Sequence, residues 1–254
     1  MSKEDGHRAS MIDLDRGRSI SEILRATLAL YRAFPCLFLI LAAAVIVPYD
    51  LVVLAATGQG PFGGAHESFG VRQLLNVLSF SLVTPLISAL HVHAVVMIGQ
   101  SRRPRLAEVA ILGMRVLPVV SAAEIMANIG ILLGFVALIL PGIFLALRWS
   151  VVAQSAAVEH DGWLLALRRS RMLTADHYGH IFGLSFVVGA LTVGSRLGVA
   201  AVAYGGTSGA PSVTLGIAVD TILASLSALT LAVLYFDLRA REAERAVVDS
   251  PSSR

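Results

Sequence analysis

Residues 140–183 read LPGIFLALRWSVVAQSAAVEHDGWLLALRRSRMLTADHYGHIFG, and this stretch decides the class of the protein. Its first part is an apolar run that contains Arg148, and a charge buried in hydrocarbon persists only where another group compensates it. Its second part, WLLALRRSRML, has the spacing of an amphipathic helix, with apolar residues near one face and arginines largely off it. Such a helix lies along the lipid headgroups, and we predict that it presents to them Arg168, Arg169 and Arg171. The stretch indicates a membrane protein, and no catalytic motif accompanies it.

The composition of the chain supports the same class. Of its 254 residues, 56% are hydrophobic and 15% are charged, whereas about a quarter of the residues in soluble domains are charged. The formal net charge of +3 does not indicate nucleic-acid binding, because the arginines stand in short segments between apolar runs, where they set membrane orientation. The one cysteine, Cys36, permits neither an intramolecular disulfide nor a cysteine-based metal cluster.

Apolar runs predict six membrane spans, and the short link at Pro141 and Gly142 makes the third and fourth spans an antiparallel hairpin. Of the 20 Lys and Arg residues, 17 fall in segments that this topology places on one side. Because Lys and Arg in short loops are retained in the cytoplasm, we predict an all-α, six-span bundle in the cell membrane, inner or plasma, with both termini cytoplasmic. The predicted spans cover residues 35–56, 71–99, 119–140, 143–158, 181–204 and 213–236.

The chain divides into a disordered or weakly ordered tail at 1–18, one integral membrane domain at 19–237 and a polar cytoplasmic tail at 238–254. The membrane domain opens with Ser19 and Glu22, which have the spacing of a helix capping box. Basic amphipathic helices precede the first, third and fifth spans on the cytoplasmic side, so the domain contains three similar helix-hairpin units. Two explanations fit this pattern equally well: common ancestry with a pseudo-threefold bundle, and a simple periodic topology.

Four charged residues lie within the predicted spans at matching depth. At a rise of 1.5 Å per residue, all four lie about 6–10 Å below the outer ends of their spans. They are Asp50, Arg148, Arg196 and Asp220. A lone charge at the centre of a helix costs about 2.5–3.5 kcal/mol on the insertion scale, so unlike charges at one depth are expected to neutralise each other. We predict an outer-half charge cluster, with Arg148 and Asp220 as the favoured pair, that either locks helices together or binds a headgroup or an ion.

A second polar face is predicted near the cytoplasmic end of the third span, where Glu124 and Asn128 lie one helical turn apart. This face either lines a cavity open to the cytoplasm or forms a hydrogen-bonded seam between helices. His91 and His93 are predicted near the inner interface. Two residues apart on a helix, they point roughly 200° from each other, and no third ligand stands nearby, so we predict no metal site.

The central stretch also resembles a known family. The residues LPGIFLALRW, Glu159 and the run ALRRSRML are similar to a polytopic membrane domain that occurs alone, and fused to some bacterial glycerophosphodiester phosphodiesterases. The resemblance implies a six-helix membrane domain without established chemistry. The catalytic domain of those enzymes, a TIM barrel rich in metal-binding carboxylates and histidines, is not part of this sequence, so no hydrolase activity is implied.

No motif in the sequence predicts catalysis or a cofactor. The Gly-x-Ser-x-Gly, His-Glu-x-x-His and P-loop patterns are missing, and the Gly-rich segment 58–70 lacks the lysine and the strand–loop–helix context of a phosphate-binding loop. We predict a non-catalytic protein that binds or moves a lipid or another amphiphile through a polar-lined helix bundle. Two alternatives stay open: a structural or regulatory membrane protein that acts through a protein partner or a second copy of itself, and an interfacial lipid-modifying enzyme. Membrane lipids are the expected partners.

Overall fold

The computed structural model describes residues 16–58, 69–159, 162–204 and 210–248, and all regular structure in these ranges is helical. The elements are α2 (Ile20–Ala33), α3 (Pro35–Thr57), α4 (Phe69–Leu78), the π-helix η1 (Ser79–Val83), α5 (Thr84–Gly99), α6 (Leu106–Ala137), α7 (Ile139–Arg148), α8 (Val152–Glu159), α9 (Trp163–Thr174), α10 (Tyr178–Tyr204) and α11 (Ala210–Val248). Six helical segments are long and apolar enough to cross a membrane: Pro35–Thr57, Phe69–Gly99, Leu106–Ala137, Ile139–Glu159, Tyr178–Ala201 and Ser212–Ala246. The predicted all-α, six-span bundle is confirmed, and the chain is a multi-pass membrane protein.

The ends of α2 and α3 follow from the local sequence. Ser19 accepts the backbone N–H of Glu22, and the Glu22 carboxylate accepts the backbone N–H of Ser19 at 2.8 Å, so the predicted capping box is confirmed. α3 begins at Pro35, where a missing N–H costs no intrahelical hydrogen bond, and ends at Gly58, whose φ of +68° favours glycine. The 23 residues of α3 span about 35 Å, enough to cross the hydrocarbon core.

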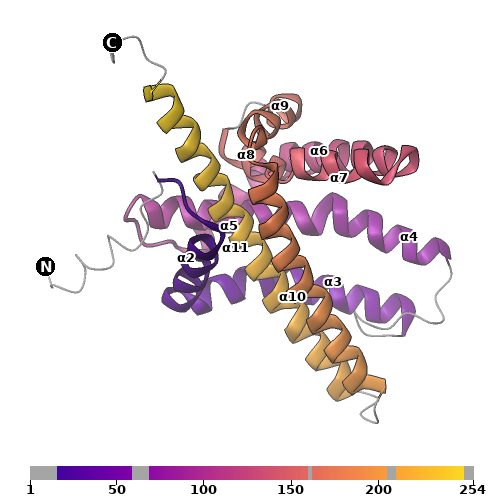
Figure 1. The fold of residues 1–254 in the computed structure, drawn as a ribbon. Coiled ribbons are helices and arrows are strands. Elements are labelled where there is room, and N and C mark those ends of the chain that lie inside the picture. Colours follow the sequence, from indigo (N-terminus) through magenta and orange to yellow (C-terminus); the bar gives the residue numbers. More distant parts are fainter. Residues whose placement is uncertain (1–15, 59–68, 160–161, 205–209, 249–254) are drawn as a thin grey trace, which may run out of the picture.

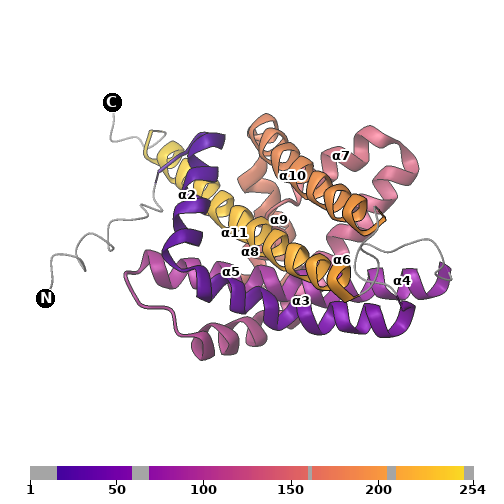
Figure 2. The same cartoon turned by 90° about the horizontal axis from the view of Figure 1, so that it is seen from below.

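The long helix α11 organises the bundle. It crosses the whole molecule in Figure 1, and Figure 2 shows it between α3 on one side and α10 on the other. Its contacts also include α2 and α5. The main hydrophobic core forms where α5, α8 and α11 meet, and its fully buried side chains include Val92, Ala157 and Val233.

The chain reverses between α6 and α7 at a different residue from the predicted one. α6 continues through Pro118 to Ala137, so the predicted amphipathic helix and third span form one continuous helix. The chain turns at Leu138, whose φ of −166° and ψ of 155° are extended. Pro141 and Gly142 lie in the first turn of α7, where the proline nitrogen needs no intrahelical acceptor. The predicted turn at these two residues is wrong, because proline suits a first helical turn as well as a reverse turn.

The predicted contact between the third and fourth spans is confirmed, and glycines make it close. A Cβ at Gly142 would lie 2.4 Å from the Phe135 ring, and a Cβ at Gly134 would lie 3.0 Å from the Cα of Gly142. A Cβ at Gly130 would lie 2.5 Å from the Trp149 ring. The α6–α7 hairpin therefore packs at distances that larger residues at these positions would not permit.

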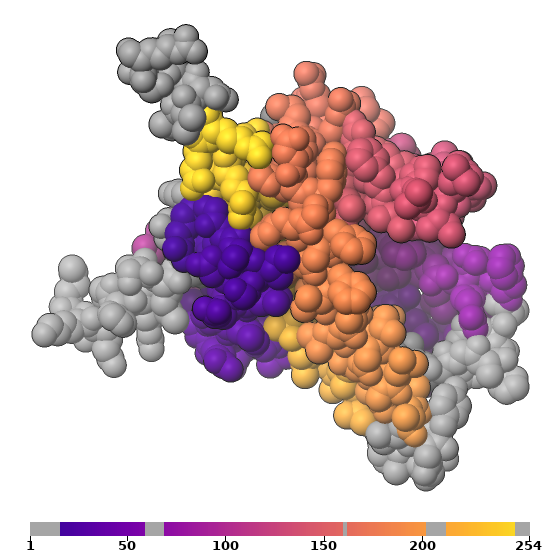
Figure 3. All heavy atoms as spheres, viewed as in Figure 1, coloured from indigo at the N-terminus to yellow at the C-terminus, as the bar shows by residue number. Residues whose placement is uncertain are grey.

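α10 is the least buried of the six spans. Figure 3 shows it lying across the face of the molecule. A Cβ at Gly183 would meet Ile20 at 2.8 Å, but Gly194 and Gly198 have nothing within 4 Å. Of these three glycines of α10, only Gly183 thus lies at a close helix contact.

The C-terminal part of α11 extends the membrane domain beyond the predicted boundary at residue 237. Residues 238–248 continue the same helix. Asp237 is fully buried; it accepts the backbone N–H of Arg18 and a hydrogen bond from Nε of Arg241 at 3.0 Å. Nη2 of Arg241 also donates to the backbone carbonyl of Arg18. Both predicted domain boundaries therefore fall within packed structure, and the predicted tails lie outside the described residues only at 1–15 and 249–254.

The three predicted helix-hairpin units are built differently in detail. Phe34 separates α2 from α3, and residues 175–177 separate α9 from α10, whereas the second amphipathic segment is continuous with α6. The fourth span is also broken, at residues 149–151 between α7 and α8. Equivalent positions in the units thus have different local geometry, and their common ancestry stays a prediction.

Candidate functional site

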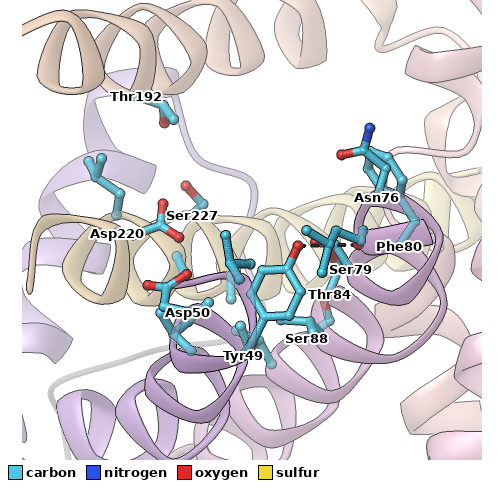
Figure 4. A pocket seen from close by; sticks show the side chains of 18 of the residues that line it. Tyr49, Asp50, Asn76, Ser79, Phe80, Thr84, Ser88, Thr192, Asp220 and Ser227 are labelled. Carbon is cyan, nitrogen blue, oxygen red and sulfur yellow. Dashed lines mark hydrogen bonds between the residues drawn. The ribbon is translucent and has the colours of Figure 1, made fainter. Parts of the chain in front are cut away.

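A cavity of about 530 Å³ lies between α3, the α4–η1–α5 segment, α10 and α11. This volume falls within the roughly 300–1,000 Å³ typical of small-molecule sites. The cavity wall combines aliphatic side chains with polar and charged ones that come from different helices (Figure 4). The polar lining residues are Tyr49, Asp50, Arg72, Asn76, Ser79, Thr84, Ser88, Thr192, Arg196, Asp220 and Ser227.

The α4–η1–α5 segment shapes one wall of the cavity through a change of helical pitch. A π-helical turn is rare and is frequent at functional sites, and η1 contributes Ser79, Phe80 and Val83 to the lining. The hydroxyl of Tyr49 on α3 donates to the backbone carbonyl of Leu75 at 3.2 Å, shown as a dashed line in Figure 4. This bond ties α3 to α4 beside the cavity.

Asp50 differs from Asp220 and Arg196, which bond to each other, because its own carboxylate has no hydrogen-bond partner among the described residues. The residue is 1% exposed, and neither carboxylate oxygen has a hydrogen-bond partner in the described part of the chain. The carboxylates of Asp50 and Asp220 point toward one another in Figure 4. Asp220 accepts a hydrogen bond from Nη2 of Arg196 at 3.0 Å, so one of the two carboxylates is paired and the other is not. An unpaired carboxylate in a membrane span is costly, which makes Asp50 a candidate functional residue.

The predicted charge cluster is formed by three of its four members. Asp50, Arg196 and Asp220 line the same cavity, as counting depth along the spans predicts. The predicted pair of Arg148 and Asp220 is wrong, because Asp220 pairs with Arg196. Arg72, near the start of the second span, also lines the cavity and was not among the predicted site residues.

Arg148 lies outside the cavity because α7 is short. The helix ends at Arg148 after ten residues, and counting depth along a straight fourth span therefore fails. The backbone carbonyl of Arg148 accepts hydrogen bonds from the hydroxyls of Ser170 and Thr174 on α9, each at 3.1 Å. Its guanidinium carbon lies 5.9 Å from the centre of the Phe144 ring, within reach of a cation–π interaction.

Glu124 and Asn128 lie on α6 and do not line the cavity. Nδ2 of Asn128 donates to the backbone carbonyl of Glu124 at 2.9 Å, and this bond stays within one helix. The Glu124 residue is 9% exposed, and its carboxylate has no hydrogen bond or ion pair among the described residues. The bond that Asn128 makes is thus not the predicted seam between helices.

The prediction that three arginines of α9 face the headgroups is wrong for Arg169. Arg168 and Arg171 are exposed, but Arg169 donates from Nε to Glu159 at 2.8 Å and from Nη1 to Glu242 at 2.6 Å. These hydrogen bonds, first the one to Glu242 and then the one to Glu159, raise the pKa of the Arg169 guanidinium above its ordinary value. Arg169 therefore links α9 to α8 and α11. Of the three arginines, only Arg168 and Arg171 remain available to lipid headgroups.

A second polar network joins the helices at the end of the bundle that holds both termini. The hydroxyl of Tyr235 donates to the same Glu159 oxygen, Oε1, at 2.9 Å, and Arg245 pairs with Asp176 at 3.2 Å. Asp237 contacts Arg18, Arg241 and, at 3.6 Å, Nε2 of His180. Together these contacts tie α11 to the residues just before α2, to α8 and α9, and to the start of α10. The sequence offered one local signal for this network, the i,i+4 spacing of Asp237 and Arg241.

His91 is part of the hydrophobic core. It is fully buried, with Nδ1 2.9 Å from the carbonyl oxygen of Ile87 and Nε2 3.0 Å from Oγ of Ser225. A carbonyl oxygen only accepts, so Nδ1 carries a proton. The ring also stacks on Phe38, with centroids 5.6 Å apart. Among the described residues, no group of three or more His, Cys, Asp or Glu side chains could hold a metal ion.

The fold and the cavity define a class: a multi-pass α-helical membrane protein with a mixed polar and apolar cavity among four of its spans. No protein-family model, curated protein or solved structure matches the chain. The resemblance of residues 140–183 to the membrane domain associated with glycerophosphodiester phosphodiesterases therefore stays a prediction. Any function must be argued from the cavity itself.

Proposed function

We propose that the protein binds a lipid or another amphiphile in the cavity between α3, the α4–η1–α5 segment, α10 and α11, without catalysing a reaction on it. The observation that carries the proposal is the buried carboxylate of Asp50, which has no hydrogen-bond partner among the described residues, in the wall of a cavity large enough for a small molecule. A structural lock would pair all its charges, whereas a binding site leaves a group for its ligand.

The two kinds of lining support an amphiphilic ligand. The charged residues Asp50, Arg196 and Asp220 gather on one part of the wall and suit a polar headgroup. Aliphatic residues, among them Leu223 and Leu231, extend the wall along α11 and suit an alkyl chain. The least buried span, α10, borders the cavity, so only one loosely packed helix separates this part of the wall from the surrounding lipid.

The proposed orientation puts the cavity in the outer half of the cell membrane. Asp50 lies in the second half of α3 and Asp220 in the first half of α11, so the cavity lies toward the ends of the spans that are remote from the chain termini. With both termini cytoplasmic, these ends face outward. Reporter fusions after residues 65 and 208 should read as outside, and fusions after residues 104 and 161 as inside. If the reporter at residue 208 is cytoplasmic, the cavity does not lie in the outer half of the membrane.

Filling the cavity tests the proposed binding. Ala224 lines the cavity, and Ala224→Phe should occupy part of its volume. Ile222 lies two residues away on the same helix and is 41% exposed, so Ile222→Phe is the matched control. We expect the wild-type protein and the control to retain phospholipid through purification in mild detergent, measured by native mass spectrometry, and Ala224→Phe to lose it while its helical content stays unchanged.

Reconstituted liposomes separate binding from movement and from the alternative role. Transbilayer movement of an acyl-labelled lipid that Ala224→Phe abolishes would extend the proposal from binding to transport. Co-purification of one stoichiometric protein partner, with no retained lipid, would contradict the proposal and favour a structural or regulatory role. Modification of the bound lipid would favour the interfacial enzyme.

A further inference from the structure

We propose that the occupant of this cavity carries a primary ammonium group, which Asp50 and Asp220 bind. This inference rests on the proposed amphiphile binding and adds the chemistry of the headgroup. The charges around the Asp50 carboxylate and its missing hydrogen-bond donors support it.

The charges around Asp50 favour a cation. Its nearest charged neighbours are the carboxylate of Asp220, which points toward it, and the guanidinium of Arg196, which is already bonded to Asp220 at 3.0 Å. Arg72 on α4 also lines the cavity, but it is not among the charges that act on Asp50. Around Asp50 itself, two carboxylates and one guanidinium therefore leave an excess of negative charge. A phosphate or carboxylate group placed between the aspartates would be repelled by both, whereas a positive group would be attracted by both.

The missing hydrogen bonds favour an ammonium that can donate. Both oxygens of Asp50 lack a donor, and the residue is 1% exposed, so water does not replace the donor freely. A primary ammonium carries three N–H donors and could bond Asp50 and Asp220 together. A trimethylammonium has the same charge but no N–H, and it would leave the Asp50 oxygens unsatisfied.

The remaining lining residues suit the same group. Hydroxyl oxygens of Thr192 and Ser227 also line the cavity and supply acceptors for a third N–H (Figure 4). The aromatic rings of Tyr49 and Phe80 line it too, and aromatic faces attract cations. A primary ammonium on an alkyl chain is present in ethanolamine phospholipids and in soluble long-chain amines. The cavity recognises the primary ammonium group that both kinds of molecule share.

The test compares ligands that differ only in the ammonium. Purified full-length protein in mild detergent is titrated with fluorescent acyl-labelled phosphatidylethanolamine and with the same label on phosphatidylcholine. Both lipids are zwitterionic, so net charge does not distinguish them. We expect phosphatidylethanolamine to bind about tenfold more tightly, the effect of one charge-assisted hydrogen bond. Dodecylamine and dodecyltrimethylammonium repeat the comparison for soluble amines and show which source the cavity accepts.

The matched variants are Asp50→Asn and Asp176→Asn. The first keeps the shape of the side chain and removes its charge, and we expect it to bind both lipids with equal affinity. The second removes a carboxylate whose side chain is 77% exposed and lies outside the cavity, and the preference should persist. If Asp50→Asn does not fold, the comparison of headgroups on the wild-type protein still decides the question.

The outcomes separate the two proposals. If neither lipid nor amine binds, amphiphile binding fails, and the ammonium assignment fails with it. Equal binding of both lipids and both amines, or a preference for anionic phosphatidylglycerol, overturns the ammonium assignment and leaves amphiphile binding intact. Binding of dodecylamine without phosphatidylethanolamine supports the ammonium site and identifies its ligand as a soluble amine.

Discussion

Replacing Asp237 tests whether its hydrogen bonds with Arg18 and Arg241 hold α11 in place. The buried carboxylate accepts the backbone N–H of Arg18 and a hydrogen bond from Nε of Arg241 at 3.0 Å. Asp237→Ala removes both acceptors at once and leaves the Arg241 guanidinium without its carboxylate. The variant should therefore loosen the contact between α11 and the start of α2.

The expected cost follows from the burial of the two partners. Breaking a fully buried ion pair costs about 3–5 kcal/mol, because one charge is left uncompensated. The Arg241 side chain is 27% exposed and keeps its hydrogen bond to the Arg18 carbonyl, so partial solvation reduces the loss. We expect Asp237→Ala to lower the free energy of unfolding by about 3 kcal/mol.

Unfolding of the purified protein in mixed micelles, with increasing SDS and detection of helical circular dichroism, measures this change. Asp176→Ala is the control, since its ion pair with Arg245 has side chains that are 77% and 51% exposed and should contribute less than about 1 kcal/mol. Adding Arg241→Met to Asp237→Ala should cost less than the sum of the single changes, because no unpaired charge then remains. A loss for Asp237→Ala no larger than for Asp176→Ala would refute the reasoning.

Three further predictions concern packing, lipid contact and pH. Gly142→Leu should destabilise the α6–α7 hairpin by about 1–3 kcal/mol in the same unfolding assay, whereas Gly194→Leu, with open space around its Cβ, should not. Combined Arg168→Gln and Arg171→Gln should weaken docking of α9 on anionic nanodiscs by about 1 kcal/mol per charge. The measurement is hydrogen exchange in α9, which should become faster in the variant and, at high salt, in the wild-type protein as well. Burial, and then the charge of Arg245, lowers the pKa of His177 below its ordinary 6.5; the unfolded chain therefore binds the proton more readily, and stability should fall as pH falls below 6.5. His177→Gln should reduce that fall in a series of melting temperatures across pH.

The sequence predicts the spans well because their signal is local. The first predicted span and α3 share Pro35 as their first residue and differ by one residue at the other end, since proline and glycine mark those ends. The capping box at Ser19 is equally local. The turn before α7 is ambiguous by contrast, because Pro141 fits a turn and a first helical turn equally well. Only tertiary packing of Gly142 on Phe135 decides between them.

The candidate site is predictable only in part. Counting residues along straight helices brings Asp50, Arg196 and Asp220 to one level, and they do line one cavity. The same count fails for Arg148, because it assumes a span that continues through residue 148 without a break. The π-helical turn η1 has no sequence pattern that distinguishes it from α-helix, so its contribution to the cavity could not be predicted.

The hydrogen bond between Asp237 and Arg18 could not be predicted from the sequence for a different reason. Asp237 binds a residue 219 positions away, and the segment that follows it, LRAREAER, is rich in charged residues, as in a solvated tail. A charged residue next to a span usually marks the cytoplasmic interface and does not specify a distant partner. Local patterns thus predict an orientation for this segment but not its burial.

The contacts of Asp237 and the pair of Arg196 with Asp220 hold their helices with different strength. This difference determines which helix of the cavity wall can move to admit a ligand. α11 is fixed by buried contacts of Asp237, which cost about 3 kcal/mol to break. α10 is the least buried span, and the described ion pair that joins it to α11 is that of Arg196 with Asp220 at 3.0 Å. An ammonium that binds Asp50 and Asp220 would compete with Arg196 for the same carboxylate. The looser packing of α10 therefore favours access to the cavity past α10, with α11 unmoved.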